Sequence, residues 1–223
     1  MLFRDRFEAG QLLAQKLMAY ADKSDVLILA LPRGGVPVAY EVAMTLHVPM
    51  DILVVRKLGV PGREELAMGA IASGGIYVLN EAVIVMEQIP LEIVHEVAKR
   101  ELKEIERRER VYRGDRPLPI IEDRTVILID DGLATGATMH AAIRVLRQHS
   151  PARLVVAAPV GAEQTCSQFR DEVDEIVCAV TPDPFTAVGM WYDDFSQIAD
   201  EEVRDLLHKA WEQEALIYQA AQR

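Results

Sequence analysis

The feature that most constrains this chain is a run of four aliphatic residues, Val126 to Ile129, that leads directly into Asp130 and Asp131. A strand made only of aliphatic residues is typical of a parallel sheet that is covered on both faces. The carboxyl end of such a strand opens into the crevice where α/β sheets bind ligands. Small and hydroxyl residues from Ala134 to Thr138 follow, and an apolar helix pattern begins after them. We therefore expect a strand, an acidic tip, a tight loop and a helix, with both carboxylates displayed at a binding edge.

The loop after the two aspartates has the composition of an anion site. The backbone N–H groups of Ala134 to Thr138 and the positive end of the next helix dipole favour a phosphate, and Gly136 permits a close approach. Carboxylates repel phosphate, so Asp130 and Asp131 must serve another part of the ligand, such as sugar hydroxyls or a metal. The implied ligand is a sugar phosphate. The plainer alternative is an ordinary turn with an incidental Asp-Asp pair, because turns also favour Asp, Gly and Thr.

Residues 126–139 resemble the phosphoribosyl pyrophosphate motif of the type I phosphoribosyltransferases, which has four hydrophobic residues, two acids, a short variable segment and then Thr-Gly-x-Thr. The resemblance implies that Asp130 and Asp131 hold the 2′ and 3′ hydroxyls of the ribose, and that the following loop wraps the 5′-phosphate. The ribose-5-phosphate site that it implies comprises Asp130, Asp131, Gly132, Ala134, Thr135, Gly136, Ala137 and Thr138.

A second glycine-containing loop, Pro32 to Gly35, lies between an apolar run at Asp25 to Leu31 and a helical pattern at Val36 to Leu46. Two glycines allow close approach to an anion, and Arg33 adds a fork of donors that suits phosphate. A Gly-Gly pair is also common in plain turns. In the resembled family, a loop of this form binds pyrophosphate, often through a strained or cis peptide bond. The pyrophosphate site implied by the resemblance comprises Arg33, Gly34, Gly35 and Lys57.

A third informative segment follows a strand expected at Met50 to Val55. Three cations, Arg56, Lys57 and Arg63, occur within eight residues of a chain that is acidic overall. Such a segment can be a solvated surface turn, because Gly and Pro mixed with charges are common in loops. The resemblance favours a long flexible lid that closes over the pyrophosphate, and adenine phosphoribosyltransferases carry a similar Arg-Lys followed by Gly and Pro-Gly. It makes Arg56, Lys57, Arg63, Asp130 and Asp131 the candidate catalytic residues.

The alternation of the remaining elements defines the expected fold class. Residues 69–80 alternate like a hairpin around Ser73-Gly74-Gly75 and would form the root of the lid. Helices are expected at 5–21, 91–112, up to about 149, at 162–169 and at 201–221, and further strands at 154–159 and 176–180. Strands that alternate with helices in this way predict an α/β fold, a doubly wound, mostly parallel sheet with flanking helices, a lid hairpin and a small C-terminal hood. We expect a single domain over residues 1–223, with a core at about 22–180, a lid at about 58–80 and the hood with its helix at about 181–223.

Composition excludes several other classes of protein. The formal net charge of −11 argues against a nucleic-acid-binding surface, which needs dense basic patches. No run approaches the roughly 20 apolar residues that a membrane span needs, so we expect no membrane partner and a cytoplasmic location. Cys166 and Cys178, the only cysteines, are expected to be buried free thiols in a reducing compartment.

Aromatic residues gather near the C-terminus, at Val188 to Phe195, although they make up only 6% of the chain. Such a cluster beside a cleft can stack on a planar base. It can equally be a packing plug beneath the last helix, because aromatic clusters are commonly core. Members of the resembled family carry a variable hood that recognises the base, and on that ground Trp191 and Tyr192 are the candidate base contacts.

The resemblance implies a phosphoribosyltransferase that moves a 5-phosphoribosyl group from phosphoribosyl pyrophosphate to a nitrogenous base, with a purine as the candidate, and releases pyrophosphate. Magnesium would arrive with the phosphoribosyl pyrophosphate, with no direct protein ligand, and a homodimer is a further expectation. Ala134 occupies the position of an Asp in the 6-oxopurine enzymes, which argues against hypoxanthine or guanine. The alternative is a regulatory protein of the same fold that binds phosphoribosyl pyrophosphate or nucleotides without catalysis. A phosphatase or kinase that uses Asp130 is a third interpretation, weakened for the kinase by the missing Gly-Lys-Ser/Thr loop.

Overall fold

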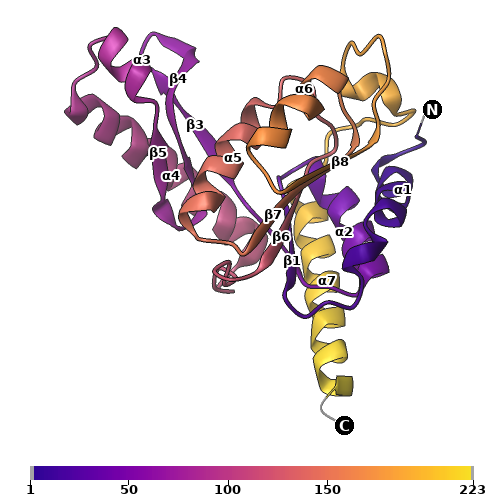
Figure 1. The fold of residues 1–223 in the computed structure, drawn as a ribbon. Helices are drawn as coiled ribbons and strands as arrows, with labels where there is room; N and C mark the ends of the chain where they lie inside the picture. The colour runs from indigo at the N-terminus through magenta and orange to yellow at the C-terminus, as the bar shows by residue number, and fades with distance from the viewer. Residues whose placement is uncertain (1–2, 222–223) are drawn as a thin grey trace.

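A five-stranded parallel sheet forms the centre of the molecule, as a computed structural model of residues 3–221 shows (Figure 1). Its strand order is β2-β1-β6-β7-β8, and all four neighbouring pairs are parallel. The strands are β1 (Val26–Ala30), β2 (Met50–Ile52), β6 (Thr125–Ile129), β7 (Arg153–Val160) and β8 (Glu175–Val180). The doubly wound α/β class predicted from the alternation of elements is confirmed.

Helices cover both faces of this sheet, which explains why its central strands are aliphatic throughout. Every residue of β1 and β6 is buried. Ile28 and Ile127 face the side covered by α1 (Arg6–Lys16), α2 (Gly35–Leu46) and α7 (Asp200–Ala221). Leu27 and Leu128 face the side covered by α5 (Ala137–Gln148) and α6 (Glu163–Gln168). Burial of each such side chain contributes about 1.5–3 kcal/mol, and a hydrophobic cluster forms on each face of the sheet.

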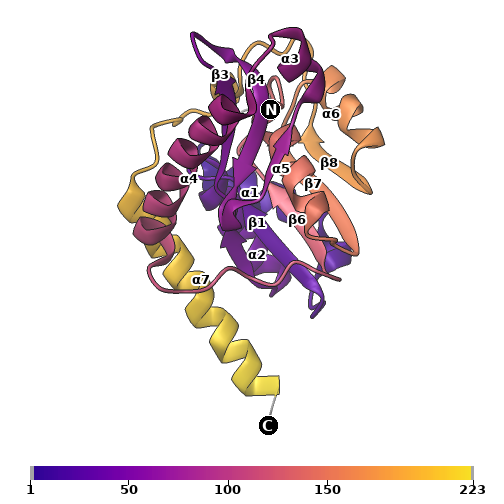
Figure 2. The same ribbon diagram turned by 90° about the vertical axis from the view of Figure 1, so that its left-hand side faces the viewer.

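A second sheet, antiparallel and three-stranded, stands beside the first (Figure 2). It consists of β3 (Val55–Val60), β4 (Arg63–Ala72) and β5 (Tyr77–Leu79), and α3 (Glu81–Met86) and α4 (Leu91–Arg113) follow it. Leu58 and Met68 pack towards α4, whereas Val55 and Val78 pack towards α5. The hairpin expected around Ser73-Gly74-Gly75 is present, as β4 and β5 pair across that turn.

Two predictions about this region are wrong. The strand expected at Met50 to Val55 is broken, because β2 ends at Ile52 and Val55 begins β3 in the other sheet. The segment that starts at Arg56, expected to be a long flexible loop, is instead the β3–β4 hairpin. Its turn falls at Pro61 and Gly62, and Gly62 has a φ of +78°.

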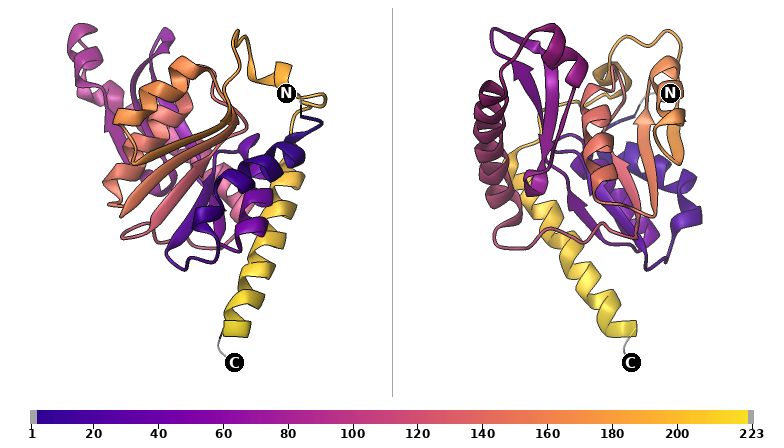
Figure 3. Two further views of the ribbon diagram at one scale, coloured as in Figure 1. Left: turned by 45° about the vertical axis from the view of Figure 1, so that its right-hand side comes forward. Right: turned by 60° about the vertical axis from the view of Figure 1, so that its left-hand side comes forward.

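The segment between β8 and α7 lies at the end of the molecule that also holds the N-terminus (Figure 3). After β8 the chain is irregular apart from a 3₁₀ turn at Val188–Trp191. Phe3 and Tyr192 form an isolated parallel β-bridge through their backbones, so the N-terminal segment and the hood pack together. The last helix, α7, packs against α2 and α4, and its C-terminal end projects beyond the body of the molecule (Figures 1 and 2).

Cys166 and Cys178 form a disulfide between α6 and β8, with Cα atoms 6.7 Å apart. The prediction of two free thiols is therefore wrong. The β7–α6–β8 crossover places two residues that are 12 positions apart in the sequence side by side, next to Gly161.

Candidate active site

The two glycine-containing loops lie next to each other where the direction of the sheet's winding reverses. From β1 the chain passes to β2 on one side, whereas β6 is followed by β7 on the other. Ligands bind at such a switch point in open α/β sheets. A Cβ placed on Gly34 would overlap Oδ2 of Asp131 and come 2.6 Å from its Cγ, and one placed on Gly35 would come 2.7 Å from the carbonyl oxygen of Ile129. The loop after β1 therefore packs directly on the acid pair that ends β6.

The two aspartates differ in their surroundings. Oδ1 of Asp130 accepts a hydrogen bond of 2.9 Å from the backbone N–H of Asp131. Oδ2 of Asp131 accepts one of 2.8 Å from Nε of Arg6, which is only 7% exposed. Burial raises the pKa of Asp130 well above its usual range, and the charge of Asp131 raises it further. Burial also raises the pKa of Asp131, while Arg6 opposes that shift.

The loop from Leu133 to Gly136 has the shape of an anion cradle. Leu133 donates to the carbonyl of Val160 at 2.9 Å, and Oγ1 of Thr165 donates to the carbonyl of Ala134 at 2.5 Å. Gly136, with a φ of +68°, then turns the chain into α5. A Cβ there would come 2.7 Å from the ring of Phe169, so both the conformation and the space require glycine.

The backbone donors of this cradle are free to bind an anion. Within residues 3–221, the N–H groups of Thr135, Gly136 and Thr138 have no hydrogen-bond acceptor. Thr135 and Thr138 are exposed, as are Ala134 and Ala137. The motif residues predicted for the 5′-phosphate are thus brought together at the N-terminus of α5, where the helix dipole favours negative charge.

The loop predicted to bind pyrophosphate contains a cis peptide bond between Pro32 and Arg33. Gly35 begins α2, whose N-terminus lies beside the acid pair. The Arg33 side chain is half-buried, and its Nη1 lies 3.5 Å from Oδ1 of Asp200 at the start of α7. Asp200 also accepts a hydrogen bond of 2.8 Å from Tyr112, so a carboxylate of the last helix holds Arg33 in this structure.

The three cations of the β3–β4 hairpin, Arg56, Lys57 and Arg63, are not equally close to the N-terminus of α5. Arg56 and Lys57 line a pocket that Thr138 and Ala141 of α5 also line. Arg56 is paired with Glu101 of α4 at 2.6 Å, and Lys57 is 3.7 Å from an exposed Glu65. Arg63 lies at the hairpin tip, where its Nη1 is 2.8 Å from Glu87. The structure therefore brings Arg56 and Lys57 to the site and does not bring Arg63 there.

The two aromatic residues predicted to contact a base occupy different environments. Tyr192 is buried, with its ring between those of Phe3 and Phe195, and its hydroxyl donates to the carbonyl of Asp131 at 2.6 Å. It therefore offers no open face for stacking, because its ring already packs in the hood. Burial raises its pKa. Trp191 is half-buried, and its indole Nε1 is enclosed without a hydrogen-bond partner among the described residues.

Arg6 is the residue of the site that sequence reasoning missed. It lies in the first turn of α1, 125 positions from Asp131, and no spacing or motif joins the two. Its interruption of an otherwise apolar helix face was the one available signal.

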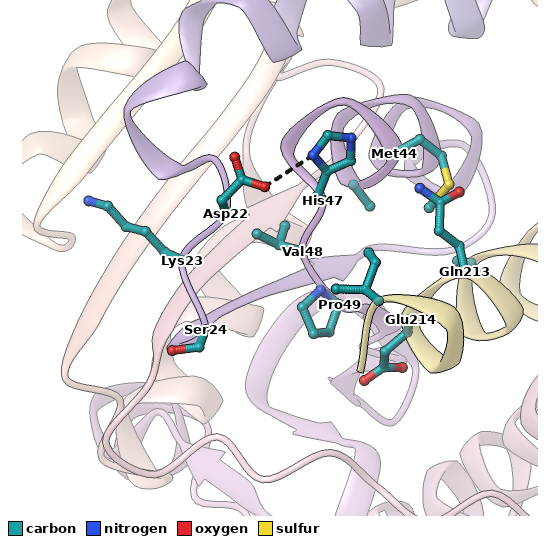
Figure 4. A pocket seen from close by; sticks show the side chains of 12 residues that line it. Asp22, Lys23, Ser24, Met44, His47, Val48, Pro49, Gln213 and Glu214 are labelled. Atoms are coloured by element: carbon teal, nitrogen blue, oxygen red, sulfur yellow. Dashed lines mark hydrogen bonds and ion pairs between the residues drawn. The ribbon is translucent and has the colours of Figure 1, made fainter. Parts of the chain in front are cut away.

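A separate pocket lies near the start of β1, between the loop that precedes this strand, the end of α2 and the C-terminal half of α7 (Figure 4). Asp22 and His47 face each other across its rim at 3.1 Å, and Gln213 and Glu214 of α7 approach from the other side. None of the motif residues lines it.

Comparisons with known proteins show the family to which the chain belongs. The family model described as the phosphoribosyl transferase domain matches residues 61–193. The chain belongs to this phosphoribosyl transferase domain family. Within residues 3–221, none of the helices is long and apolar enough to cross a membrane.

Two relatives show how far the similarity extends. The Mycobacterium tuberculosis protein "Putative phosphoribosyl transferase Rv0571c" is 45% identical over 210 residues, which are 94% of this chain and 47% of that protein. The chain thus spans about half the length of this relative. The crystal structure of TT1426 from Thermus thermophilus superposes with a TM-score of 0.84 at 39% identity, and covers 94% of this chain and 99% of that one. The AQ2163 protein from Aquifex aeolicus, at 13% identity and a TM-score of 0.51, shares the fold alone.

Proposed function

We propose that this protein transfers a 5-phosphoribosyl group from phosphoribosyl pyrophosphate to a nitrogenous base, with release of pyrophosphate. The observation that carries the proposal is the packing of Gly34 against Asp131. It joins a loop suited to one phosphate group, an acid pair suited to sugar hydroxyls and a second loop suited to another phosphate. Phosphoribosyl pyrophosphate carries these three chemical groups in that arrangement, with phosphates at both ends of a ribose.

Each part of the site has a distinct role in this reaction. Asp130 and Asp131 accept hydrogen bonds from the ribose hydroxyls, and residues 134–138 bind the 5′-phosphate through backbone N–H groups. Arg33, Gly34, Gly35 and Lys57 bind the pyrophosphate. The bond from C1 to the leaving oxygen breaks with cation-like character at C1, so the protein contributes positioning and electrostatic stabilisation and needs no covalent nucleophile.

Magnesium enters this proposal as part of the substrate. Mg²⁺ typically keeps several waters and binds through one or two carboxylates together with substrate phosphates. The carboxylates at hand are Asp130 and Asp131, and Oδ2 of Asp131 is already engaged by Arg6. We therefore expect the phosphates of the substrate to be its main ligands and the metal to help neutralise the departing pyrophosphate.

The acceptor is proposed as a purine other than a 6-oxopurine. The small side chain of Ala134 leaves no carboxylate at the position used by the 6-oxopurine enzymes. Trp191 remains the proposed base contact, because Tyr192 is committed to packing and to the Asp131 carbonyl. A homodimer, a cytoplasmic location and the absence of nucleic-acid and membrane partners also remain predictions.

Calorimetry with phosphoribosyl pyrophosphate and magnesium tests the donor site. Asp131→Asn combined with Thr135→Ala should weaken binding by about 100-fold, because each removes a hydrogen bond to a charged group. Asp115→Asn combined with Thr45→Ala is the matched control, since both residues are exposed and lie outside the site. Equal affinities for the two double variants would exclude the assigned site.

A screen of nucleobases for pyrophosphate release tests the reaction itself. One observation favours the regulatory alternative, namely that Arg56 and Arg63 are both held in ion pairs with the α3–α4 region. Binding of phosphoribosyl pyrophosphate without pyrophosphate release on any purine, pyrimidine or related heterocycle would replace the enzyme with that alternative.

A further inference from the structure

Arg6 is a buried cation that the reaction as described does not use. Its side chain is 8% exposed, although it comes from the first turn of a surface helix. Arg4, two residues earlier, is 75% exposed and pairs only with the neighbouring Glu8 among the described residues. The burial of Arg6 is therefore a specific property of that position and not of the N-terminal segment.

Three groups hold the guanidinium of Arg6 in one orientation. Nε donates to Oδ2 of Asp131 at 2.8 Å, and Nη1 donates to the backbone carbonyl of Ser196 at 3.0 Å. The ring of Phe195 lies 4.0 Å from Cζ, in the geometry of a cation–π contact. The cation is thus braced against the hood and aimed at the second acid of the motif.

The position of Arg6 leaves one oxygen of Asp131 available. Oδ2 lies between Arg6 and Gly34, whose missing side chain makes room for it. In the described part of the chain, Oδ1 of Asp131 makes no hydrogen bond or ion pair with another residue. A carboxylate fixed through one oxygen presents its other oxygen in a defined direction, which is the requirement for accepting a sugar hydroxyl.

We propose that Arg6 is a positioning residue for the ribose, because it fixes Oδ2 of Asp131 and so presents Oδ1 to a ribose hydroxyl. This inference rests on the proposed function. On this proposal Arg6, a residue of the N-terminal helix, contributes to recognition of the sugar and not to recognition of the phosphates.

Arg6 also favours the ionised form of Asp131, because its charge and hydrogen bond oppose the rise in the pKa of Asp131 that burial causes. The titratable and charged groups around Asp131 are Arg6 from α1, Asp130 from its own loop and Tyr192 from the hood, with Asp194 of the hood influenced by Arg6 as well. Arg6 is the cation among them. Loss of that cation should move the ionisation of Asp131 to higher pH.

Calorimetric titrations of wild type, Arg6→Gln, Arg6→Lys and Arg4→Ala test the proposal. The two probes are phosphoribosyl pyrophosphate and inorganic pyrophosphate, and each is titrated in the presence of magnesium. Arg6→Gln should weaken phosphoribosyl pyrophosphate about tenfold or more and leave pyrophosphate affinity within about twofold. The acid limb of its binding profile should move to higher pH. Arg6→Lys should restore the pH profile more fully than the affinity, because lysine keeps the charge but lacks the fork of donors. Arg4→Ala should bind as wild type does.

The possible results distinguish a failure of the proposed function from a failure of the role assigned to Arg6. A wild-type protein that does not bind phosphoribosyl pyrophosphate overturns the proposed function. A wild type that binds, together with an Arg6→Gln variant that binds equally well, overturns the role of Arg6 alone. A parallel loss of affinity for both probes in a less stable Arg6→Gln protein overturns it too, in favour of a purely structural ion pair. Arg6→Gln is chosen over Arg6→Ala because it keeps most of the side chain's length and a hydrogen-bond donor.

Discussion

Gly34 and Asp131 are in direct contact, and the contact depends on the missing side chain of the glycine. The backbone of Gly34 has a φ of −60° and a ψ of −35°, which any residue can adopt. Glycine is therefore required at this position by space and not by conformation, since a Cβ would come 2.6 Å from Cγ of Asp131.

Gly34→Ala should lower the free energy of unfolding by about 1–3 kcal/mol through overpacking and should weaken phosphoribosyl pyrophosphate binding. Denaturant unfolding of the single variants and of the double variant with Asp131→Ala measures the coupling between the two residues. In the Asp131→Ala background, Gly34→Ala should lower the free energy of unfolding by much less. Additive losses would show that the clash lies elsewhere.

The acid pair should make stability and ligand binding depend on pH in opposite directions. Burial raises the pKa of Asp130 and of Asp131 above the unfolded value of about 3.9. Their contribution to stability is therefore fully present below that unfolded value and is lost as the pH rises through the folded pKa. Binding of ribose hydroxyls needs the ionised form and should increase over the same range.

Unfolding curves of wild type and Asp130→Asn, recorded from about pH 4 to pH 8, isolate this contribution. Wild type should lose stability relative to the variant as the pH rises. A difference between the two proteins that does not change with pH would contradict the raised pKa.

Lys57 should matter for turnover and not for stability. Its side chain is 41% exposed, and its ion-pair partner Glu65 is fully exposed at 3.7 Å. Lys57→Ala should change the free energy of unfolding by no more than about 0.5 kcal/mol and should lower turnover about 10- to 100-fold. Lys16→Ala, an exposed lysine at the end of α1, is the control. Equal turnover of the two variants would show that Lys57 is a surface residue with no role in the reaction.

Tyr192→Phe should cost about 1 kcal/mol of stability, because it leaves the Asp131 carbonyl without its donor. It should also weaken phosphoribosyl pyrophosphate binding, since that carbonyl belongs to the motif loop. Tyr20→Phe removes a comparable hydroxyl, which donates to Glu175 at 2.6 Å near the other end of β8. That control should lose stability and keep its affinity, whereas a loss of affinity in both variants would point to a global effect.

The disulfide should contribute about 3 kcal/mol to stability, given the short loop that it closes. Reductant should lower the unfolding midpoint of wild type and should not affect a Cys166→Ser, Cys178→Ser double variant. The intact mass of unreduced protein should be lower by two hydrogen atoms than that of the reduced form. Two reactive thiols in the unreduced protein would contradict the bond.

The parts of the fold that could be predicted are those with local causes. The aliphatic run at Val126 to Ile129 identified β6, because burial on both faces leaves no polar position. The alternation of strands and helices predicted the parallel sheet, and the small residues after β1 and β6 predicted the loops that end these strands. Leu58 and Val60 alternate with Lys57 and Gly59, which is a strand signal, but glycine and proline nearby favoured the interpretation as a loop.

The parts that could not be predicted depend on contacts between distant residues. The chain crosses from one sheet to the other within the unbroken apolar run Ile52-Leu53-Val54-Val55, so no change of composition marks the boundary. Cys166 meets Cys178 only through the β7–α6–β8 crossover. The ion pair of Arg6 with Asp131 spans 125 positions and obeys no periodicity.

The hydrogen bond from Tyr192 to the Asp131 carbonyl has a consequence for protein engineering. Exchange of the hood for that of a relative would be designed as a simple graft, meant to change the acceptor and spare the donor half of the reaction. The graft would in fact remove a support of the proposed ribose-binding loop, and with Phe195 and the Ser196 carbonyl it would also remove two contacts that hold Arg6. A transplanted hood must therefore carry its own tyrosine and its own seat for the arginine, or acceptor and donor specificity will change together.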